Sequence, residues 1–369
     1  MPADYQFQPD LARATTLPSR WYTDTALLDA ERTAIFARAW QAVGHGERVA
    51  QPGQYFACDI AGEPILVTRA NDGRLRAFSN VCRHRGAELC SAPGSGNVIR
   101  CPYHGWTYTL DGALHGAPEF EGVAEWDRSQ VRLPEFRAEI WGPYVFVCQD
   151  PAAPPLAEVM GAIPAEVAKM GCPIDRLHFA CRRDYTIECN WKVYVDNYLE
   201  GYHLPAAHPS LFRELDYAQY RVDTFRYYSS QIAPIRARDN AAGQRRYQFA
   251  NSENQALYYW IFPNYMLNVY PDNLSANIIL PLGPEKTLTI FEWFAYGDAG
   301  VQQATIDFSD EIQQEDITIC ESVQRGLRSR NYDRGRFSVK RENGVHHFHG
   351  LLAEFLTPQK RTAEREASL

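Results

Sequence analysis

The chain has the length and composition of a folded protein with one large domain or two ordinary ones. Of its 369 residues, 45% are hydrophobic and 22% are charged, and the formal net charge is −8. These values exclude a disordered chain, and a negative charge without a basic run argues against a nucleic-acid partner. No apolar stretch approaches a membrane span, and the polar N-terminus lacks a signal-peptide core, so we expect a cytoplasmic protein without membrane association.

The nine cysteines are an odd number and are scattered along the chain. That distribution differs from the spacing of a disulfide scaffold. In a reducing compartment, cysteines close to histidines are more often metal ligands than members of a disulfide. We therefore expect metal binding where Cys and His cluster, and small buried hydrophobic residues elsewhere.

Local patterns divide the chain into three segments. Residues 25–40 repeat apolar positions at helical spacing behind an N-cap at Asp24, which predicts a helix. Short β-rich runs broken by turn residues follow, as in "EPILVTRANDGRLRAFSNV", until the Pro-rich "DPAAPPLAEVM" ends this region. We predict an α+β fold with an N-terminal helical segment at 1–42, an all-β domain at 43–150 and a mixed domain at 151–369.

The mixed segment alternates two kinds of pattern. Helices are predicted near residues 156–170, 191–204 and 307–328. Strand-like runs such as "LSANIILPLG" and "TLTIFEWFAYG" lie between them. The chain shows no internal repeat, which excludes a repeat architecture.

Two short Cys/His pairs stand in the β-rich segment: Cys82-x-His84 and, sixteen residues later, Cys101-x-x-His104. Unliganded core residues, a structural zinc site and a [2Fe–2S] cluster are the three interpretations of these four residues. Classical zinc fingers separate cysteines from histidines, whereas here each pair mixes the two types. Two mixed loops can each give one ligand to each iron of a two-iron cluster, so the spacing favours a Rieske [2Fe–2S] centre.

A second site is suggested by His203-x4-His208 in "NYLEGYHLPAAHPS". Histidines five apart diverge around a regular helix. Pro205 is expected to unwind the turn between them, and Pro209 disfavours helix at His208, so the two rings can converge. Two histidines and one carboxylate form the ligand triad of non-haem Fe(II) oxygenases.

The third ligand of that triad is sought among the carboxylates. Glu200 is near in sequence, whereas Asp316 interrupts an apolar helical stripe and Glu315 is expected to point elsewhere. A carboxylate on an apolar face must be neutralised, paired or bound to metal. A buried, hydrogen-bonded Asp is the alternative, and we favour Asp316 as a ligand. The stripe consists of Ile312, Ile319, Val323 and Leu327.

Together, the two motifs resemble those of the catalytic α subunits of Rieske non-haem iron oxygenases. The similarity covers nearly the whole chain, from "WYTDTALLDAERTAIFARAWQAVGH" through "CPYHGWTYTLDG" and "NWKVYVDNYLEGYH" to "ESVQRGLRS". It implies an N-terminal Rieske [2Fe–2S] domain and a C-terminal helix-grip catalytic domain, on which residues 1–42 would pack. An antiparallel sheet would lie over a mononuclear Fe(II), and O₂ would be a substrate.

The resemblance also implies a ring-shaped homotrimer in which electrons cross between subunits. His104 of one subunit would face a carboxylate that hydrogen-bonds His203 of the next. By its position that carboxylate is Glu200, which is therefore assigned as the electron-transfer bridge and not as a ligand. Asp316 would be the third iron ligand, and Asn197 would lie beside the iron site outside the ligand set.

The residues around Glu200 are similar to one branch of the family. Ring-hydroxylating dioxygenases usually have Asp there, whereas "DNYLEGYH" looks like the branch of choline monooxygenase and the glycine betaine, proline betaine and carnitine oxygenases. The resemblance implies N-demethylation of a betaine-like quaternary ammonium compound through hydroxylation next to nitrogen. Hydroxylation of an aromatic acid, or a Rieske electron carrier with an inactive second domain, are the alternatives.

Two further features concern the partner and the substrate. No dinucleotide fingerprint occurs in the chain, so NAD(P)H would act through a separate reductase or ferredoxin. Aromatic faces hold ammonium groups best, and "LYYWIFPNYMLNVY" supplies several aromatic rings. The candidate pocket residues are Tyr258, Trp260, Phe262 and Asn268, although a packed core uses the same residue types.

Overall fold

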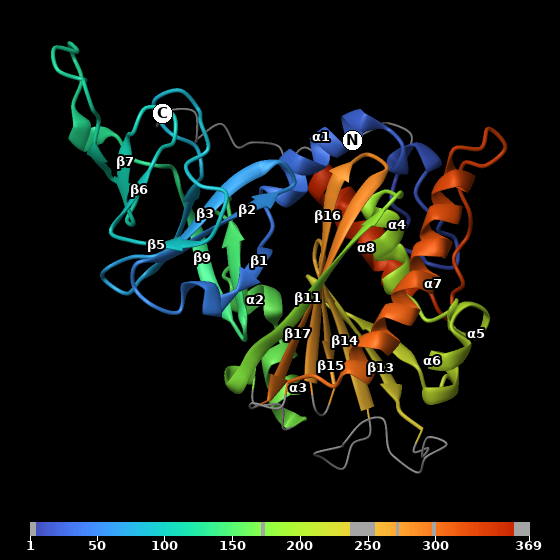
Figure 1. Ribbon diagram of the computed structural model, residues 1–369. Coiled ribbons are helices and arrows are strands. Elements are labelled where there is room, and N and C mark those ends of the chain that lie inside the picture. Colours follow the sequence, from blue (N-terminus) through green and yellow to red (C-terminus); the bar gives the residue numbers. More distant parts are fainter. Residues whose placement is uncertain (1–4, 171–173, 237–254, 271–272, 297–299, 358–369) are drawn as a thin grey trace.

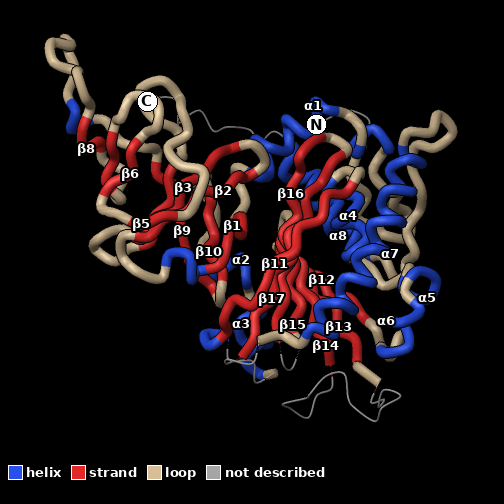
Figure 2. The backbone as a smooth tube through the Cα atoms, viewed as in Figure 1, coloured by secondary structure: helices blue, strands red, loops and turns tan. Residues whose placement is uncertain are grey.

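The computed structural model shows an α+β protein built on antiparallel sheets, as predicted (Figure 1). Strands run through both halves of the molecule, and most helices lie beside the C-terminal sheet (Figure 2). Within the described residues, no helix combines the length and apolar character needed to cross a bilayer. The structure describes residues 5–170, 174–236, 255–270, 273–296 and 300–357.

The N-terminal half contains a seven-stranded sheet in the order β1-β10-β9-β4-β3-β2-β5 and a small sheet β6-β7-β8. The turn at Asn71-Asp72-Gly73 joins β3 to β4, and Gly73 has a φ of +80°, which glycine adopts without strain. The strands are β1 Gln41–His45, β2 Gln54–Ile60, β3 Glu63–Arg69, β4 Leu75–Ser79, β5 Gly94–Ser95, β6 Val98–Arg100, β7 Thr107–Thr109, β8 Leu114–Gly116, β9 Glu135–Trp141 and β10 Tyr144–Cys148.

The C-terminal half contains a second seven-stranded sheet in the order β11-β17-β16-β15-β14-β13-β12. All its neighbouring strands are antiparallel. The strands are β11 Leu177–Ile187, β12 Arg221–Thr224, β13 Tyr228–Pro234, β14 Gln255–Ile261, β15 Tyr265–Val269, β16 Asn273–Gly283 and β17 Lys286–Tyr296.

Helices cover the C-terminal sheet, with the long α7 beside α4 (Figure 1). The pattern predicted at 156–170 forms two helices, because the chain turns at Gly161 with a φ of +52°. The α-helices are α1 Thr25–Glu31, α2 Leu156–Met160, α3 Ile163–Lys169, α4 Trp191–Tyr198, α5 Leu204–Ala207, α6 Pro209–Glu214, α7 Gln303–Leu327 and α8 Asn343–Leu356. Short 3-10 turns are η1 Ser19–Tyr22, η3 Gly46–Val49, η4 Arg128–Gln130 and η5 Ile174–Arg176.

The helix expected over residues 25–40 is shorter than its apolar pattern. The Asp24 side chain caps α1 by accepting the N–H of Ala26 at 2.9 Å, and the regular helix ends at Glu31. One π-helical turn, η2 Arg32–Phe36, follows. The expectation of helix beyond Phe36 is wrong. The chain enters β1 at Gln41, and the apolar residues Trp40 and Ala42 are buried in the hydrophobic core around that strand.

The two faces of the C-terminal sheet pack against different helices. Along β14, Tyr259 faces α3, and its hydroxyl donates to Glu166 at 2.7 Å. The next residue, Trp260, points to the opposite face and contacts Phe348 of α8 with ring centroids 5.2 Å apart. This alternation is the two-residue period of a strand. The face that carries Trp260 is therefore covered by α8 at this end of the sheet.

A buried ion pair joins the N-terminal segment to α4. Glu31 and Lys192 are 0% and 1% exposed, and their charged atoms lie 2.5 Å apart. The Trp191 indole also donates to Glu31, at 2.7 Å. Burial lowers the pKa of Lys192, and the neighbouring Glu31 carboxylate partly offsets that effect. The pair ties α1 to the helix that leads into the candidate iron site.

We expect Lys192→Met to lower the free energy of unfolding by ~3–5 kcal/mol, because the Glu31 carboxylate would remain buried without its cation. The double variant Glu31→Gln/Lys192→Met should recover most of that loss, since no charge is left behind. Thermal and urea unfolding of the three proteins measure the difference. Equal stability of the single variant and the parent protein would show that the pair is not needed.

Candidate metal centres

The chain between α4 and α6 brings two histidines to one place. Asn190 caps the start of α4, because its side chain accepts the N–H of Lys192 at 3.0 Å, and the helix ends at Tyr198. His203 lies just before α5, and His208 lies between α5 and α6 with φ −120° and ψ 70°. The chain therefore changes direction at His208.

The predicted role of Pro205 is wrong, whereas that of Pro209 agrees with the structure. Residues 204–207 form a helical turn, with Pro205 in its first turn. A proline there loses nothing, because the first N–H groups of a helix have no intrahelical partner. The break falls at His208, the residue before Pro209, where helical geometry is disfavoured.

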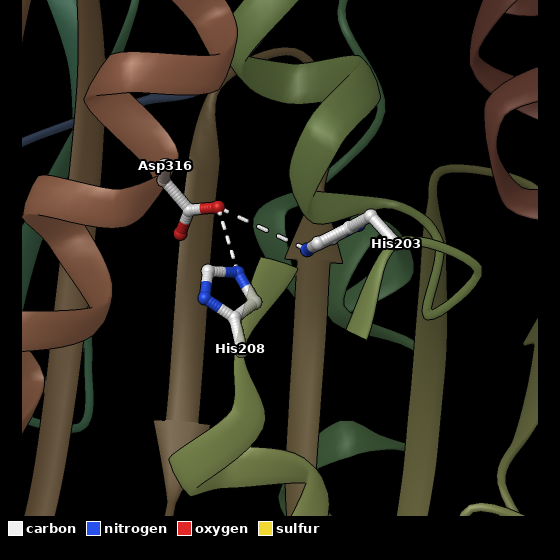
Figure 3. Close-up of side chains that lie close together, drawn as sticks. All are labelled: His203, His208 and Asp316. Atoms are coloured by element: carbon white, nitrogen blue, oxygen red, sulfur yellow. Dashed lines mark hydrogen bonds and ion pairs between the residues drawn. The ribbon is translucent and has the colours of Figure 1, made fainter. Parts of the chain in front are cut away.

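His203 just before α5, His208 between α5 and α6, and Asp316 on α7 point toward one another (Figure 3). One Asp316 oxygen, Oδ1, lies 3.0 Å from His208 Nε2 and 3.8 Å from His203 Nε2. One ligand atom from each residue fits within 4.8 Å of the other two. Among the described residues, no other group of three or more His, Cys, Asp or Glu residues meets that limit. The side chain of His208 is 1% exposed.

A second carboxylate holds each imidazole from its far side. Glu200 Oε1 lies 2.6 Å from His203 Nδ1, and Glu315 Oε2 lies 2.6 Å from His208 Nδ1. An ionised carboxylate only accepts hydrogen bonds, so each Nδ1 carries the proton. Nε2 then has the lone pair that a metal requires, and both Nε2 atoms face Asp316.

Glu315 is the residue of this site that the sequence reasoning missed. We expected it to point away from the histidines, and the structure shows that expectation to be wrong. Successive helical residues differ by about 100° around the axis, so neighbours such as Glu315 and Asp316 can approach one histidine from two sides. The signal available in the sequence was the pair itself, two adjacent carboxylates on a helix.

Asp316 has its own hydrogen-bond donor. The Asn197 side chain on α4 donates to Asp316 Oδ1 at 2.6 Å. Three residues earlier on the same helix, the Tyr194 hydroxyl bonds Gln313 of α7, and Gln313 donates to Thr289 of β17 at 3.1 Å. These contacts fix α7 against α4 and the sheet at the height of the site.

The apolar stripe used to select Asp316 is displaced in the structure. Val323 is 45% exposed, whereas Gln313 and Gln324 are 1% exposed. Buried glutamines are tolerated because both form hydrogen bonds, Gln324 with the backbone N–H of Asn190 at 2.9 Å. Asp316 therefore lies at the edge of the buried face, where a side chain can reach both the core and the histidines.

The proton equilibrium of His208 reflects its two carboxylate neighbours. Burial alone would lower the pKa of His208, but the hydrogen bonds and charges of Asp316 and Glu315 raise it above its ordinary value. The same carboxylates that attract a proton would attract a divalent cation. The donor set therefore fits an iron ion held by two nitrogens and one oxygen.

The two Cys/His loops of the N-terminal half have the same backbone form. The N–H of Gly86 bonds the carbonyl of Cys82 at 3.0 Å, and the N–H of Gly105 bonds the carbonyl of Cys101 at 3.1 Å. Both glycines have positive φ, +75° and +74°. Residues with a Cβ rarely adopt this conformation, which explains the paired glycines.

The side chains of these loops also gather. The rings of His84 and His104 lie 4.7 Å apart, and His84 stacks on Trp106 at 4.9 Å. His84 Nδ1 is buried without a hydrogen-bond partner among the described residues. Cys82 and Cys101 are 3% and 2% exposed, and burial raises the pKa of Cys82 although the Tyr108 hydroxyl partly opposes it.

This donor set fits a two-iron cluster better than one zinc ion. Ligands of a tetrahedral zinc with bonds of ~2.3 Å lie about 3.8 Å apart, and no three of the four Cys/His ligand atoms come within 4.8 Å of one another. Two irons spread the ligands further apart. The loops lie on the far side of the molecule from α5 and α7 (Figure 1).

A cavity of about 150 Å³ opens beside His203, His208 and Asp316. Two of the four residues expected in the substrate pocket, Tyr258 and Asn268, line it. Trp260 and Phe262 do not, and that expectation is wrong. Trp260 lies on the same face of β14 as Tyr258, and Phe262 directly follows the strand. Both are buried against α8, through Phe348 and Phe355.

Two family models match the chain. "Rieske [2Fe-2S] domain" matches residues 39–127, and "Ring hydroxylating alpha subunit (catalytic domain)" matches residues 174–357. The first contains the four Cys/His residues of the loops, and the second contains the His203, His208 and Asp316 group. The two matches thus separate the two candidate centres into two domains.

Curated relatives match along nearly the whole chain. Chloroplastic choline monooxygenase of Arabidopsis thaliana is 36% identical over 94% of this chain and 85% of its own length. The carnitine monooxygenase oxygenase subunit of Escherichia coli strain K12 is 34% identical over 92% of this chain and 94% of its own length.

Solved structures agree with this relationship. A quaternary ammonium Rieske monooxygenase in complex with L-carnitine has a TM-score of 0.81 and 31% identity, over 95% of this chain and 99% of that chain. Naphthalene 1,2-dioxygenase from Rhodococcus sp. is 20% identical with a TM-score of 0.75, over 93% and 95% of the two chains, and shares the fold. The chain therefore belongs to the Rieske non-haem iron oxygenases, as an α subunit with a Rieske [2Fe–2S] domain and a catalytic domain for mononuclear iron.

Proposed function

We propose that this chain is the oxygenase component of a multicomponent Rieske monooxygenase that N-demethylates a small quaternary ammonium or N-methylated compound. The observation that carries the proposal is the convergence of His203, His208 and Asp316 beside a cavity. The similarity of the chain to choline and carnitine monooxygenases, whose substrates carry a quaternary ammonium group, supports the ammonium chemistry.

The residues divide between two cofactors. We assign Cys82 and Cys101 to one iron of the [2Fe–2S] cluster, and His84 and His104 to the other. The group His203, His208 and Asp316 would hold Fe(II), a triad that leaves coordination positions open. Together, the bound metals would supply electron storage and the activation of O₂.

The reaction we propose balances with two electrons from outside the chain. One C–H bond next to nitrogen, O₂, two electrons and two protons give a C–OH group and one water. The N-hydroxymethyl group then loses its hydroxyl proton to solvent, and its C–N bond breaks with the electron pair staying on nitrogen. This step releases formaldehyde and leaves one methyl group fewer on nitrogen. The chain has no dinucleotide motif, so NAD(P)H would deliver the electrons through a reductase or ferredoxin.

The chain's residues would bind the substrate and hold the ligands in place. Glu200 and Glu315 orient the two imidazoles, and Asn197 fixes the Asp316 oxygen that faces them. Tyr258, Phe291 and further aromatic rings line the cavity beside them and would offer an apolar surface to a bound substrate. This division of roles follows the general pattern of metal sites, in which outer hydrogen bonds tune and orient the ligands.

Electron transfer is proposed to cross between subunits of a homotrimer. The Cys/His loops and the iron site lie on opposite sides of one subunit (Figure 1), and His104 is exposed. Glu200 would bridge His203 to the His104 of a neighbouring subunit. The solved structure of a similar quaternary ammonium Rieske monooxygenase gives insight into inter-subunit electron transfer in that protein, which supports this arrangement.

Three further assignments belong to the proposal. We divide the chain into a helical segment at 1–42, the Rieske domain at 43–150 and the catalytic domain at 151–369. A cytoplasmic location stays a prediction, and the plant relatives are named as chloroplastic. Hydroxylation of an aromatic acid is the alternative reaction, whereas the intact triad disfavours an inactive second domain.

Asp316→Ala should lose the mononuclear iron while the Rieske cluster stays intact. We expect iron affinity at this site to fall by more than about 100-fold, because loss of an outer hydrogen bond alone costs about 10–100-fold. Iron and sulfide analysis with EPR spectroscopy distinguishes the two centres. Asp307→Ala, at a more exposed position on the same helix, is the control. Full mononuclear iron in Asp316→Ala would remove this residue from the ligand set.

Glu315→Gln should weaken iron binding by ~10–100-fold, because the neutral amide holds the His208 Nδ1 proton less strongly. The measurement is iron release to a chelator, which does not depend on turnover. Glu311→Gln, four residues earlier on α7 and bonded to Ser210, is the matched control. If both variants release iron at the parent rate, Glu315 does not position His208.

Glu200→Gln should slow electron transfer between the two centres by ~10–100-fold in molecules whose iron site is filled, the usual cost in activity of changing an outer hydrogen-bond partner. Rapid-mixing absorbance follows reoxidation of the reduced cluster after addition of O₂ and substrate. Iron analysis of the same sample shows whether the iron site is filled. An unchanged reoxidation rate with a filled site would rule out the proposed bridge.

A further inference from the structure

The charged residues on the cavity walls limit which ionised groups a bound substrate can carry. Among the described residues that line the cavity, none is Lys or Arg, while Glu200 and Asp316 supply carboxylates. Arg341 lies near this wall, but its guanidinium donates to the backbone carbonyls of Tyr220 and Tyr217 at 3.1 and 3.3 Å. A carboxylate on the substrate would therefore be buried without a cation from these residues, which is costly.

An aromatic corner on the same walls suits a cation. The rings of Tyr258 and Tyr270 lie 5.9 Å apart and are nearly perpendicular, at 86°. Phe291 and Trp293 of β17 also line the cavity, with ring centroids 5.9 Å apart. Aromatic faces attract ammonium groups through their quadrupole, and the attraction grows when the cation loses water.

The cavity wall also contains a buried hydrogen-bond acceptor, the side-chain oxygen of Asn277. Asn277, on β16, lines the cavity and is 4% exposed, and its side-chain oxygen has no hydrogen-bond partner among the described residues. By contrast, Asn268 is engaged, since it accepts from the Tyr198 hydroxyl at 2.8 Å and donates to Ser275 at 3.1 Å. A buried acceptor without a donor is costly, so a ligand hydroxyl that donates to Asn277 would relieve that cost.

We infer that the substrate carries one positive charge at an ammonium end, a neutral hydroxyl at the other end, and no carboxylate. This inference rests on the proposed function and narrows it from betaine-like compounds to cationic amino alcohols. The aromatic corner receives the ammonium group, and Asn277 accepts the hydroxyl hydrogen. A betaine would bring a carboxylate to walls whose described residues include no Lys or Arg to pair with it.

Calorimetric titration of the purified holoprotein tests this inference without turnover. The ligands are choline, glycine betaine, and 3,3-dimethylbutan-1-ol, which is choline with carbon in place of nitrogen. We expect choline to bind at least ~10-fold more tightly than either of the others, because one lacks the charge and the other adds a carboxylate. Glycine betaine binding as tightly as choline would overturn the inference and leave the proposed function standing.

Two variants test the contacts of the ligand's hydroxyl end and of its ammonium end separately. Asn277→Ala should weaken choline binding ~5-fold, the cost of one hydrogen bond, and leave tetramethylammonium, which has no hydroxyl, unaffected. Tyr270→Leu should weaken both ligands. Equal weakening of both by Asn277→Ala would contradict the placement of the hydroxyl. If an aromatic acid binds and no ammonium compound does, the proposed function itself fails.

Discussion

Each imidazole of the candidate iron site is held by a carboxylate at Nδ1, and this constraint determines the rest of the site. Glu200 and Glu315 occupy the outer nitrogens of His203 and His208, so the inner nitrogens have only Asp316 to face. One carboxylate comes from the loop before α5 and the other from α7. The geometry therefore exists only if α7 lies against the α4–α6 region, as it does (Figure 1).

The scaffold maintains that contact with buried polar bonds. Tyr194 of α4 bonds Gln313 of α7, and the pair Glu31–Lys192 anchors α4 to the N-terminal segment. Buried polar networks specify one arrangement only when every member is satisfied. Residues of α4, α7 and the C-terminal sheet line the cavity, while the Cys/His loops stand on the other side of the subunit (Figure 1). In the arrangement that we propose, the iron site of one subunit receives its electrons from the cluster of a second subunit.

Local spacing predicted more of this protein than helical or strand periodicity did. The Cys/His loops are short segments whose glycines and ligands are neighbours in sequence, so their chemistry could be inferred directly. The stripe that pointed to Asp316 is displaced, because buried glutamines such as Gln313 look polar in a sequence. Tyr258 and Trp260 share one face of β14, but their residue types could not show that α8 covers Trp260 and that a cavity faces Tyr258. Those outcomes depend on which helix reaches which part of a sheet.

A single turnover tests the central claim most directly. Chemically reduced holoprotein would be mixed with O₂ and one candidate substrate per sample, either an N-methylated ammonium compound or an aromatic acid. The products of each sample would then be assayed. Our account predicts that the cluster reoxidises and that an ammonium compound is oxygenated, with formaldehyde released where an N-methyl group is attacked. Oxygenation of an aromatic acid alone would contradict the proposed substrate class. Reoxidation without any oxygenated product would contradict a catalytic role for His203, His208 and Asp316.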